Sequence, residues 1–231
     1  MRRNVAFALA MAATCAASEA HGADDSGFTA AARLAYGFPI GNVASDSSGT
    51  LRLGDDFSGE VPIWLDAGWR FHKSIFIGGY FQYGFALVNN GSAFQASTSG
   101  VAACTIAGVS CSGSEVRVGA EILYGFAPSS SWQPWAGLGF GYEWTNLHAS
   151  GPGGEADVQY RGWEFLNIQA GVDFKIGDSF ALGPFVAFSM GEYETIAVSA
   201  TGQPTQDINI PSSSSSFHEW LQFGLKGTLN L

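Results

Sequence analysis

The stretch Trp220-Leu-Gln-Phe-Gly-Leu-Lys-Gly-Thr-Leu-Asn-Leu231 carries the pattern that decides the fold. Side chains in a β-strand point to opposite faces with a period of two residues. Trp220 shares one parity with polar and small residues, and large apolar residues hold the other: Leu221, Phe223, Leu225, Leu229 and Leu231. The stretch therefore predicts a strand with one apolar face and one mixed face.

Seven earlier segments show the same alternation between large apolar residues and Gly, Ser or polar residues. With the last segment, the predicted strands are 28–38, 61–71, 75–87, 115–126, 133–144, 163–175, 180–191 and 218–231. Strands of about 12 residues, at roughly 3.3 Å per residue and tilted by roughly 40°, reach about 30 Å. That length matches the hydrocarbon core of a membrane.

The connections between these segments alternate in length. Long ones cover 39–60, 88–114, 145–162 and 192–217, and short ones cover 72–74, 127–132 and 176–179. Long loops outside the cell and tight turns in the periplasm are typical of outer-membrane barrels. The sequence thus predicts an all-β, eight-stranded, antiparallel up-and-down transmembrane β-barrel.

A secreted lipocalin-like carrier is the rival interpretation, and it would turn the apolar face inward. The segment 75–87 alone has six large apolar or aromatic residues on that face: Ile75, Ile77, Phe81, Tyr83, Phe85 and Leu87. The interior of an eight-stranded cylinder is filled by ordinary side chains and cannot hold so many large ones. This face is therefore expected to contact lipid.

Residues 1–22 are predicted to be a signal peptide, which leaves 23–231 as one barrel domain. Arg2 and Arg3 provide a charged start, an apolar run follows, and Ala20-His21-Gly22 resembles a cleavage site. Lipidation at Cys15 is the alternative, although the preceding residues match that processing signal poorly.

Cys104 and Cys111 are expected to form a disulfide. Six residues separate them in a Ser-, Thr- and Gly-rich loop, and an exported chain meets an oxidising compartment. Two free thiols in the loop are the alternative.

The charge balance excludes one class of partner. The chain has a net charge of −10, and removal of Arg2, Arg3 and Glu19 would leave 8 basic and 19 acidic residues, or −11. No basic stripe is present to neutralise phosphates, so nucleic acid is not an expected partner.

The face opposite the apolar one is expected to line the lumen, where small and charged residues mix. Buried charges require partners, so a polar network is predicted across the lumen from Asp66, Arg70, Arg117, Glu121, Glu143, Asp173 and Lys226. It would act either as a static plug or as a gate in a narrow conduit. Aromatic girdles at the membrane interfaces are predicted from Trp69, Tyr124, Trp132, Trp135, Tyr142, Trp144 and Trp163.

The chain resembles the small eight-stranded outer-membrane barrels of Gram-negative bacteria, such as the OmpA transmembrane domain, OmpX and OmpW. The resemblance rests on the terminal strand 218–231 and on the segment 180–188. It implies a monomer in outer-membrane lipid and lipopolysaccharide, inserted by the barrel-assembly machinery. The terminal assembly signal would include Phe223, Leu225, Leu229 and Leu231, with Leu231 where the family usually has Phe.

Other candidate sites have weaker support in the sequence. His72, His148 and His218 could serve an enzyme, but no His–Ser arrangement matches the deacylases of this architecture, so solvated or interfacial histidines are expected. Two acidic groups could hold Ca²⁺, but their spacing matches no calcium loop, so solvated acidic loops are expected: Asp55, Asp56 and Glu60, and Glu155 with Asp157. We therefore expect no cofactor, no metal and no enzymatic activity.

Two functions remain open at the level of the sequence. The first is a non-enzymatic barrel with a structural or surface-interaction role through its extracellular loops. The second is an OmpW-like or porin-like conduit for small, apolar molecules. An apolar pocket near Phe76, Tyr80, Leu123 and Trp135 would favour the conduit, whereas continuous ion pairs across the lumen would favour the plug.

Overall fold

A computed structural model describes residues 26–46, 49–89, 104 and 107–231 of the chain. The predicted signal peptide, Cys15 and most of the loop 88–114 lie outside the described residues and remain predictions. Within the described part, no helix has the length and apolarity that crossing a membrane requires.

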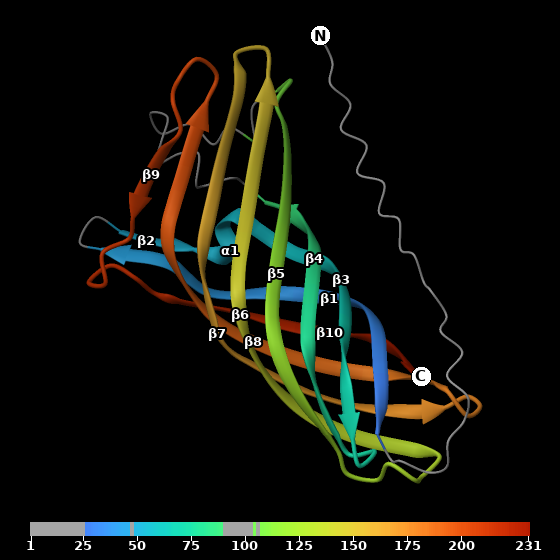
Figure 1. The fold of residues 1–231 in the computed structure, drawn as a ribbon. Helices are drawn as coiled ribbons and strands as arrows, with labels where there is room; N and C mark the ends of the chain where they lie inside the picture. The colour runs from blue at the N-terminus through green and yellow to red at the C-terminus, as the bar shows by residue number, and fades with distance from the viewer. Residues whose placement is uncertain (1–25, 47–48, 90–103, 105–106) are drawn as a thin grey trace.

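Long antiparallel strands close into one ring in the described part of the chain (Figure 1). In spatial order they are β10 (Phe217–Asn230), β1 (Gly27–Asp46), β3 (Phe57–Phe71), β4 (Ile75–Val88), β5 (Ser110–Gly125), β6 (Trp132–Gly151), β7 (Gly154–Lys175) and β8 (Phe180–Ala200). β8 pairs back to β10, which closes the ring. The prediction of an eight-stranded up-and-down barrel is confirmed.

Three short elements lie at the end of the barrel opposite the tight turns. They are β2 (Gly49–Arg52), which pairs with β1, the single-turn helix α1 (Leu53–Asp56), and β9 (Gln206–Asn209), which pairs with β8. The segment 39–60, predicted as a loop, therefore contains the end of β1, β2, α1 and the start of β3.

The predicted loop 145–162 is also wrong, because β6 and β7 continue through it as a hairpin that turns between Gly151 and Gly154. Likewise β8 runs on to Ala200 within the predicted loop 192–217. These extensions rise beyond β3 and β4 (Figure 1). The sequence pattern misses them because their outward residues are polar, so the alternation with large apolar residues stops where lipid ends.

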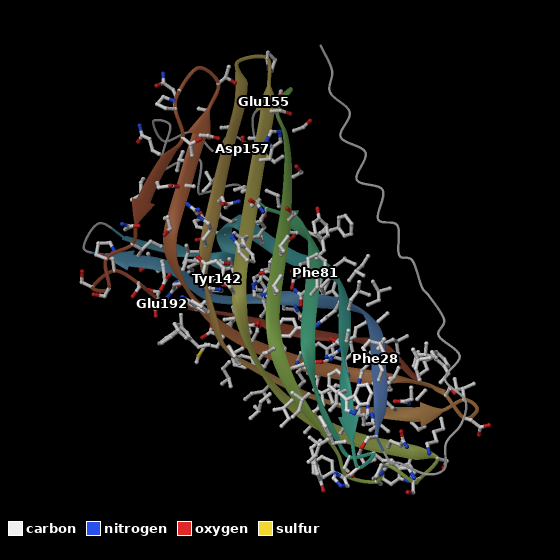
Figure 2. All side chains as sticks on the ribbon, in the orientation of Figure 1. Phe28, Phe81, Tyr142, Glu155, Asp157 and Glu192 are labelled. Carbon is white, nitrogen blue, oxygen red and sulfur yellow. A yellow bond between two sulfur atoms is a disulfide. The ribbon has the colours of Figure 1, made fainter. Side chains whose placement is uncertain are left out.

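The alternation fixes which side chains face outward. Leu225, Phe223 and Leu229 on β10 are 56%, 49% and 41% exposed, whereas their neighbours Lys226 and Thr228 are 2% exposed. The same pattern recurs around the ring, with large apolar residues such as Phe81 outside (Figure 2). The exterior is therefore an apolar belt, and the interior holds the polar face.

Trp135 corrects one assignment of the aromatic girdles. It was expected at the membrane interface but is buried in the lumen, where its indole Nε1–H donates to Asp173 Oδ1 at 2.9 Å. Its parity already matched the inward glycines of its strand. Other girdle residues do lie outside: Trp69, Tyr124, Trp132 and Trp163 are exposed, and Tyr142 and Trp144 are half-buried.

Replacing Leu225 with Arg should destabilise the barrel in a bilayer by about 2–4 kcal/mol, because a cation would then face hydrocarbon near the midplane. The measurement is the free energy of unfolding in denaturant for protein refolded into vesicles. Leu225→Ala is the matched control, since it shortens the side chain without adding charge. Equal stability of the Arg and Ala variants would mean that this face does not contact lipid.

Candidate functional site: a charged and plugged lumen

The predicted network residues lie inside the barrel, but they form two groups instead of one. Arg117, Glu143 and residues around them make an outer network, on the side of the long loops. Asp66, Glu121, Asp173 and Lys226 lie nearer the tight turns, in an inner network centred on Arg33.

The outer network surrounds the Arg117 guanidinium with carboxylates. Arg117 lies 2.8 Å from Glu115, 3.3 Å from Glu143 and 3.6 Å from Glu164, and it donates to Ser189 at 2.9 Å. The side chains of these three ion pairs are at most 1% exposed. A cation taken out of water so completely needs this number of partners.

Amide and aromatic side chains complete the outer network. Gln222 donates to Glu60 at 2.7 Å and Gln82 donates to Glu115 at 3.1 Å. Tyr80 donates to Glu164, and Gly141 leaves room for it, because a Cβ there would lie 2.6 Å from the Tyr80 hydroxyl. The glycines on the inward face thus make space for large polar side chains.

His218 belongs to this network and corrects the expectation of a solvated or interfacial histidine. It is 1% exposed, its Nε2 contacts Glu143, and its ring stacks on Tyr193 with the centroids 3.9 Å apart. The adjacent Glu219 is on the opposite face of the strand, because neighbouring residues of a strand point to opposite faces, so the two do not act together.

The inner network depends on Arg33, which was not among the predicted residues. Arg33 lies 2.7 Å from Asp66 and 3.2 Å from Glu121, and it also donates to Gln169. Its guanidinium carbon is 4.4 Å from the centroid of the Trp64 ring. The sequence pattern could have identified Arg33 as a luminal residue, since it lies on the inward parity of a strand whose outward residues are large and apolar.

Lys226 and Asp173 extend the inner network toward the turns. The Lys226 ammonium is 3.5 Å from Asp173 Oδ2 and 3.9 Å from the centroid of a Trp135 ring. Thr228 donates to the same carboxylate at 3.1 Å. Arg70, in contrast, was predicted to join the network, but in the described part of the chain it forms no ion pair: its donors reach Thr29 Oγ1 and the Lys73 carbonyl, both at 3.4 Å.

Aromatic residues pack among these charges. Phe76, Tyr80, Leu123 and Trp135, the residues proposed to line an apolar pocket, are indeed close together and are joined by buried Ala35, Trp64, Phe185 and Ala187. They contact the charged side chains directly, with Arg33 over three of the rings. This inner aromatic cluster therefore helps to fill the lumen.

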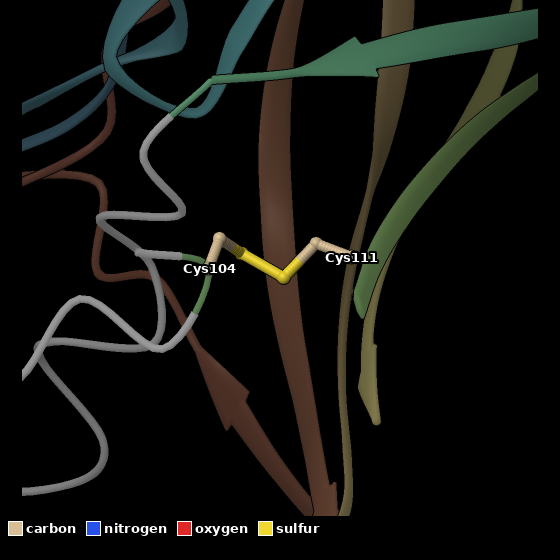
Figure 3. Close-up of a disulfide and its surroundings, with 2 residues drawn as sticks. All are labelled: Cys104 and Cys111. Carbon is tan, nitrogen blue, oxygen red and sulfur yellow. A yellow bond between two sulfur atoms is a disulfide. The ribbon is translucent and has the colours of Figure 1, made fainter. Parts of the chain in front are cut away.

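A second apolar cluster closes the end with the long loops. This outer cluster consists of Val43, Leu53, Phe57, Ala86, Leu147, Ala149, Val158, Tyr160, Tyr193 and Trp220. Helix α1 contributes Leu53 to this cluster. The buried Asp56 of the same helix accepts a hydrogen bond from the cluster residue Tyr160 at 3.2 Å. Cys104 and Cys111, joined by a disulfide, pack against its edge (Figure 3).

The acidic residues considered for Ca²⁺ binding differ in their burial. Asp55 is exposed, but Asp56 and Glu60 are fully buried, so the expectation of a solvated loop is wrong for both. Glu155 and Asp157 are exposed, as expected, on the raised hairpin (Figure 2). Among the described residues, no three His, Cys, Asp or Glu side chains are grouped to hold a metal ion.

The other two candidate histidines, His72 and His148, do not form a pair of nucleophile and base with any described residue. His148 Nδ1 lies 2.6 Å from Asp157 Oδ1, but the nearby Ser199 donates to the same aspartate instead of to the imidazole. His72 is exposed in the tight turn after β3, with φ of 49°.

Replacing Arg117 with Met should destabilise the barrel by about 3–5 kcal/mol, because three buried carboxylates would lose their shared cation. Arg161→Met is the matched control: Arg161 pairs with Asp207 on the raised sheet, and exposed pairs contribute roughly 0–1 kcal/mol. Unfolding in denaturant after refolding into vesicles measures both. If both variants lost a similar free energy of unfolding, the contribution of the Arg117 network to stability would not depend on its burial.

Comparison with solved structures identifies proteins of the same architecture. A major outer membrane protein from Thermus thermophilus is 11% identical, with 87% of this chain and 99% of that chain covered and a TM-score of 0.51. The outer membrane protein OprG from Pseudomonas aeruginosa is 10% identical, with 91% and 99% covered and a TM-score of 0.50. No family model and no curated protein matches the chain.

At these identities the likeness concerns the fold. The predicted resemblance to the small eight-stranded outer-membrane barrels is confirmed at that level. The fold and the apolar belt of large side chains around the ring identify the protein as an integral outer-membrane β-barrel.

Proposed function

We propose that the protein is a non-conducting and non-enzymatic barrel that acts through the sheet raised on its extracellular side. The observation that supports this most is the filling of the lumen. Two ion-pair networks and the inner aromatic cluster occupy the middle of the barrel, and the outer cluster covers them. Eight strands enclose an interior that side chains alone can fill.

The raised sheet has the features of a contact surface. One face packs on the outer cluster through Leu147, Val158 and Tyr160. The other face carries polar pairs between neighbouring strands: Gln159 donates to Asn146 at 2.6 Å, His148 pairs with Asp157, and Arg161 pairs with Asp207 at 2.6 Å. These cross-strand pairs hold their side chains in place, so the polar groups are ordered before any partner arrives.

The edge of this sheet supports the same role. In the described part of the chain, β9 pairs with β8 alone, and Ile208 on β9 is 50% exposed. A strand paired on one side offers its other edge to an extended segment of a partner. Surface contact can therefore use both the polar face and the backbone edge.

A conduit for small apolar molecules is the second candidate, and the inner aromatic cluster favours it. Passage would require Trp64 and Trp135 to separate from Arg33, and Trp135 to separate from Lys226, because these rings contact those cations. Loss of those contacts would expose buried charges to an apolar solute. The plugged barrel is thus the better supported proposal.

Single-channel recording tests the plug. The refolded protein in a planar bilayer should show no steady openings, whereas Arg117→Ala combined with Glu121→Ala should conduct if it still folds, because two network members are removed. Correct folding is checked by the shift of the band on boiling in a detergent gel. Steady, salt-dependent openings of the wild-type barrel would contradict the proposal.

Attachment of cells tests the surface role. Bacteria that export the wild-type chain should attach to glass coated with serum proteins several times more than bacteria that export the triple variant His148→Ala, Asp157→Ala and Arg161→Ala. The control is His72→Ala, at the opposite end of the barrel. Equal attachment of all three strains, at equal surface amounts, would contradict a contact role for the polar face.

A further inference from the structure

The end of the barrel with the tight turns contains an open cavity. It has a volume of about 260 Å³ and is lined by inward and rim residues that include Thr29, Arg70, Gln133, Lys175, Phe180 and Asn230. We call it the periplasmic vestibule. A smaller void of about 30 Å³ continues from it past Arg70 to Lys226.

Two cations that line the vestibule, half-buried Arg70 and exposed Lys175, differ from the fully buried cations of the barrel. Arg33, Arg117 and Lys226 each have a carboxylate within 3.5 Å. Among the ion pairs of the described residues, none contains Arg70 or Lys175. Among the described residues, cations are therefore paired with acids in the closed lumen, whereas Arg70 and Lys175 at its open end are not.

The position of Arg70 is fixed by neutral groups. Its Nε donates to Thr29 Oγ1 and its Nη1 to the Lys73 carbonyl, both at 3.4 Å, and the guanidinium carbon lies 6.0 Å from the centroid of the Phe76 ring. These long contacts orient the guanidinium without neutralising it. A planar guanidinium held in this way suits the oxygens of a phosphate or carboxylate.

The rim of the vestibule has a different character. Phe28 and Phe180 line it and are each 41% exposed on the outer surface of the barrel. Figure 2 labels Phe28 at this end. The lining has three cationic side chains, Arg70, Lys73 and Lys175, and one acidic side chain, Asp178. The vestibule thus joins an interior with an excess of positive charge to an apolar rim that continues into the lipid-facing belt. A ligand that fits both parts has an anionic head and an apolar tail.

We propose that the periplasmic vestibule binds a phosphate ester anion, with Arg70 and Lys175 on the phosphate, and that an anionic glycerophospholipid of the periplasmic leaflet supplies it. Its head group enters the vestibule and its acyl chains lie over Phe28 and Phe180. Asn230, whose amide oxygen accepts from Thr29 at 3.0 Å, and Gln133 provide polar groups beside the head group. The site is independent of the proposed surface function.

Native mass spectrometry tests the site on the refolded barrel released from nanodiscs with equal amounts of phosphatidylglycerol and phosphatidylcholine. The wild-type barrel should retain phosphatidylglycerol selectively. Arg70→Gln with Lys175→Gln should lower that retention about tenfold, because two charge-assisted contacts are lost. Arg52→Gln, which removes an exposed cation at the opposite end of the barrel, should leave it unchanged.

A second variant and a second probe separate the other outcomes. Ala181→Phe fills the vestibule without changing its charge and should also abolish retention, since Ala181 is buried in its wall. Titration with inorganic phosphate, followed by the Arg70 side-chain NMR signal, shows whether free phosphate binds without a lipid tail. If inorganic phosphate binds but phosphatidylglycerol is not retained, the anion site is supported and free phosphate is its ligand. The proposal would be overturned if neither phosphatidylglycerol nor inorganic phosphate bound, or if Arg52→Gln lowered lipid retention as much as the Arg70 and Lys175 variant.

Discussion

The interior of the barrel depends on the enclosure of Arg117 and Arg33 by carboxylates. Both guanidinium groups have no exposed surface, and each is surrounded by acids from different strands. A buried charge without a partner is far less stable than the same charge in water, so these contacts are obligatory. They also fix the strand register, because a slip by one residue would move Arg117 to the lipid face and large apolar residues into the lumen.

This requirement explains how the two ends of the lumen differ. Toward the long loops, the network is covered by Phe57, Trp220 and other members of the outer cluster, so its charges can only be neutralised internally. Toward the tight turns, the lumen opens into the periplasmic vestibule, where Arg70 has neutral contacts alone among the described residues. Neutralisation there can come from solvent or from a ligand. The barrel is thus closed on one side and accessible on the other.

The sequence predicts the membrane-spanning parts well because lipid imposes a strict alternation on them. Leu225 and Lys226 are neighbours in the chain yet face lipid and lumen, and this was evident from the pattern. Arg33 could have been found by the same parity. Trp135 lies on the inward parity of its strand, which agrees with its predicted place near a luminal pocket and disagrees with its predicted place in the aromatic girdle.

Other features could not be predicted because they break the alternation. The pairing of β7 with β8 shifts register between Glu164 and Leu166, so Glu164 faces the lumen although it has the opposite parity to Asp173, the predicted inward residue of that strand. A bulge of this kind leaves no mark on composition. Glu60 shares the inward parity of Asp66 on β3, but it precedes the predicted start of that strand at residue 61, so it was assigned to a loop.

The number of charges in a lumen that is proposed not to conduct has a physical explanation. If Arg117 and its carboxylates were replaced by apolar residues, both faces of several strands would be apolar, and the same strands could insert with either face toward lipid. Charges that are stable only when they meet inside the ring remove this ambiguity, because each of them makes the inverted arrangement unfavourable. Their main contribution is therefore to the choice of one barrel over its alternatives, and only secondarily to its free energy of unfolding. On this argument, an internal ion-pair network is compatible with a barrel whose functional surfaces lie at its two ends.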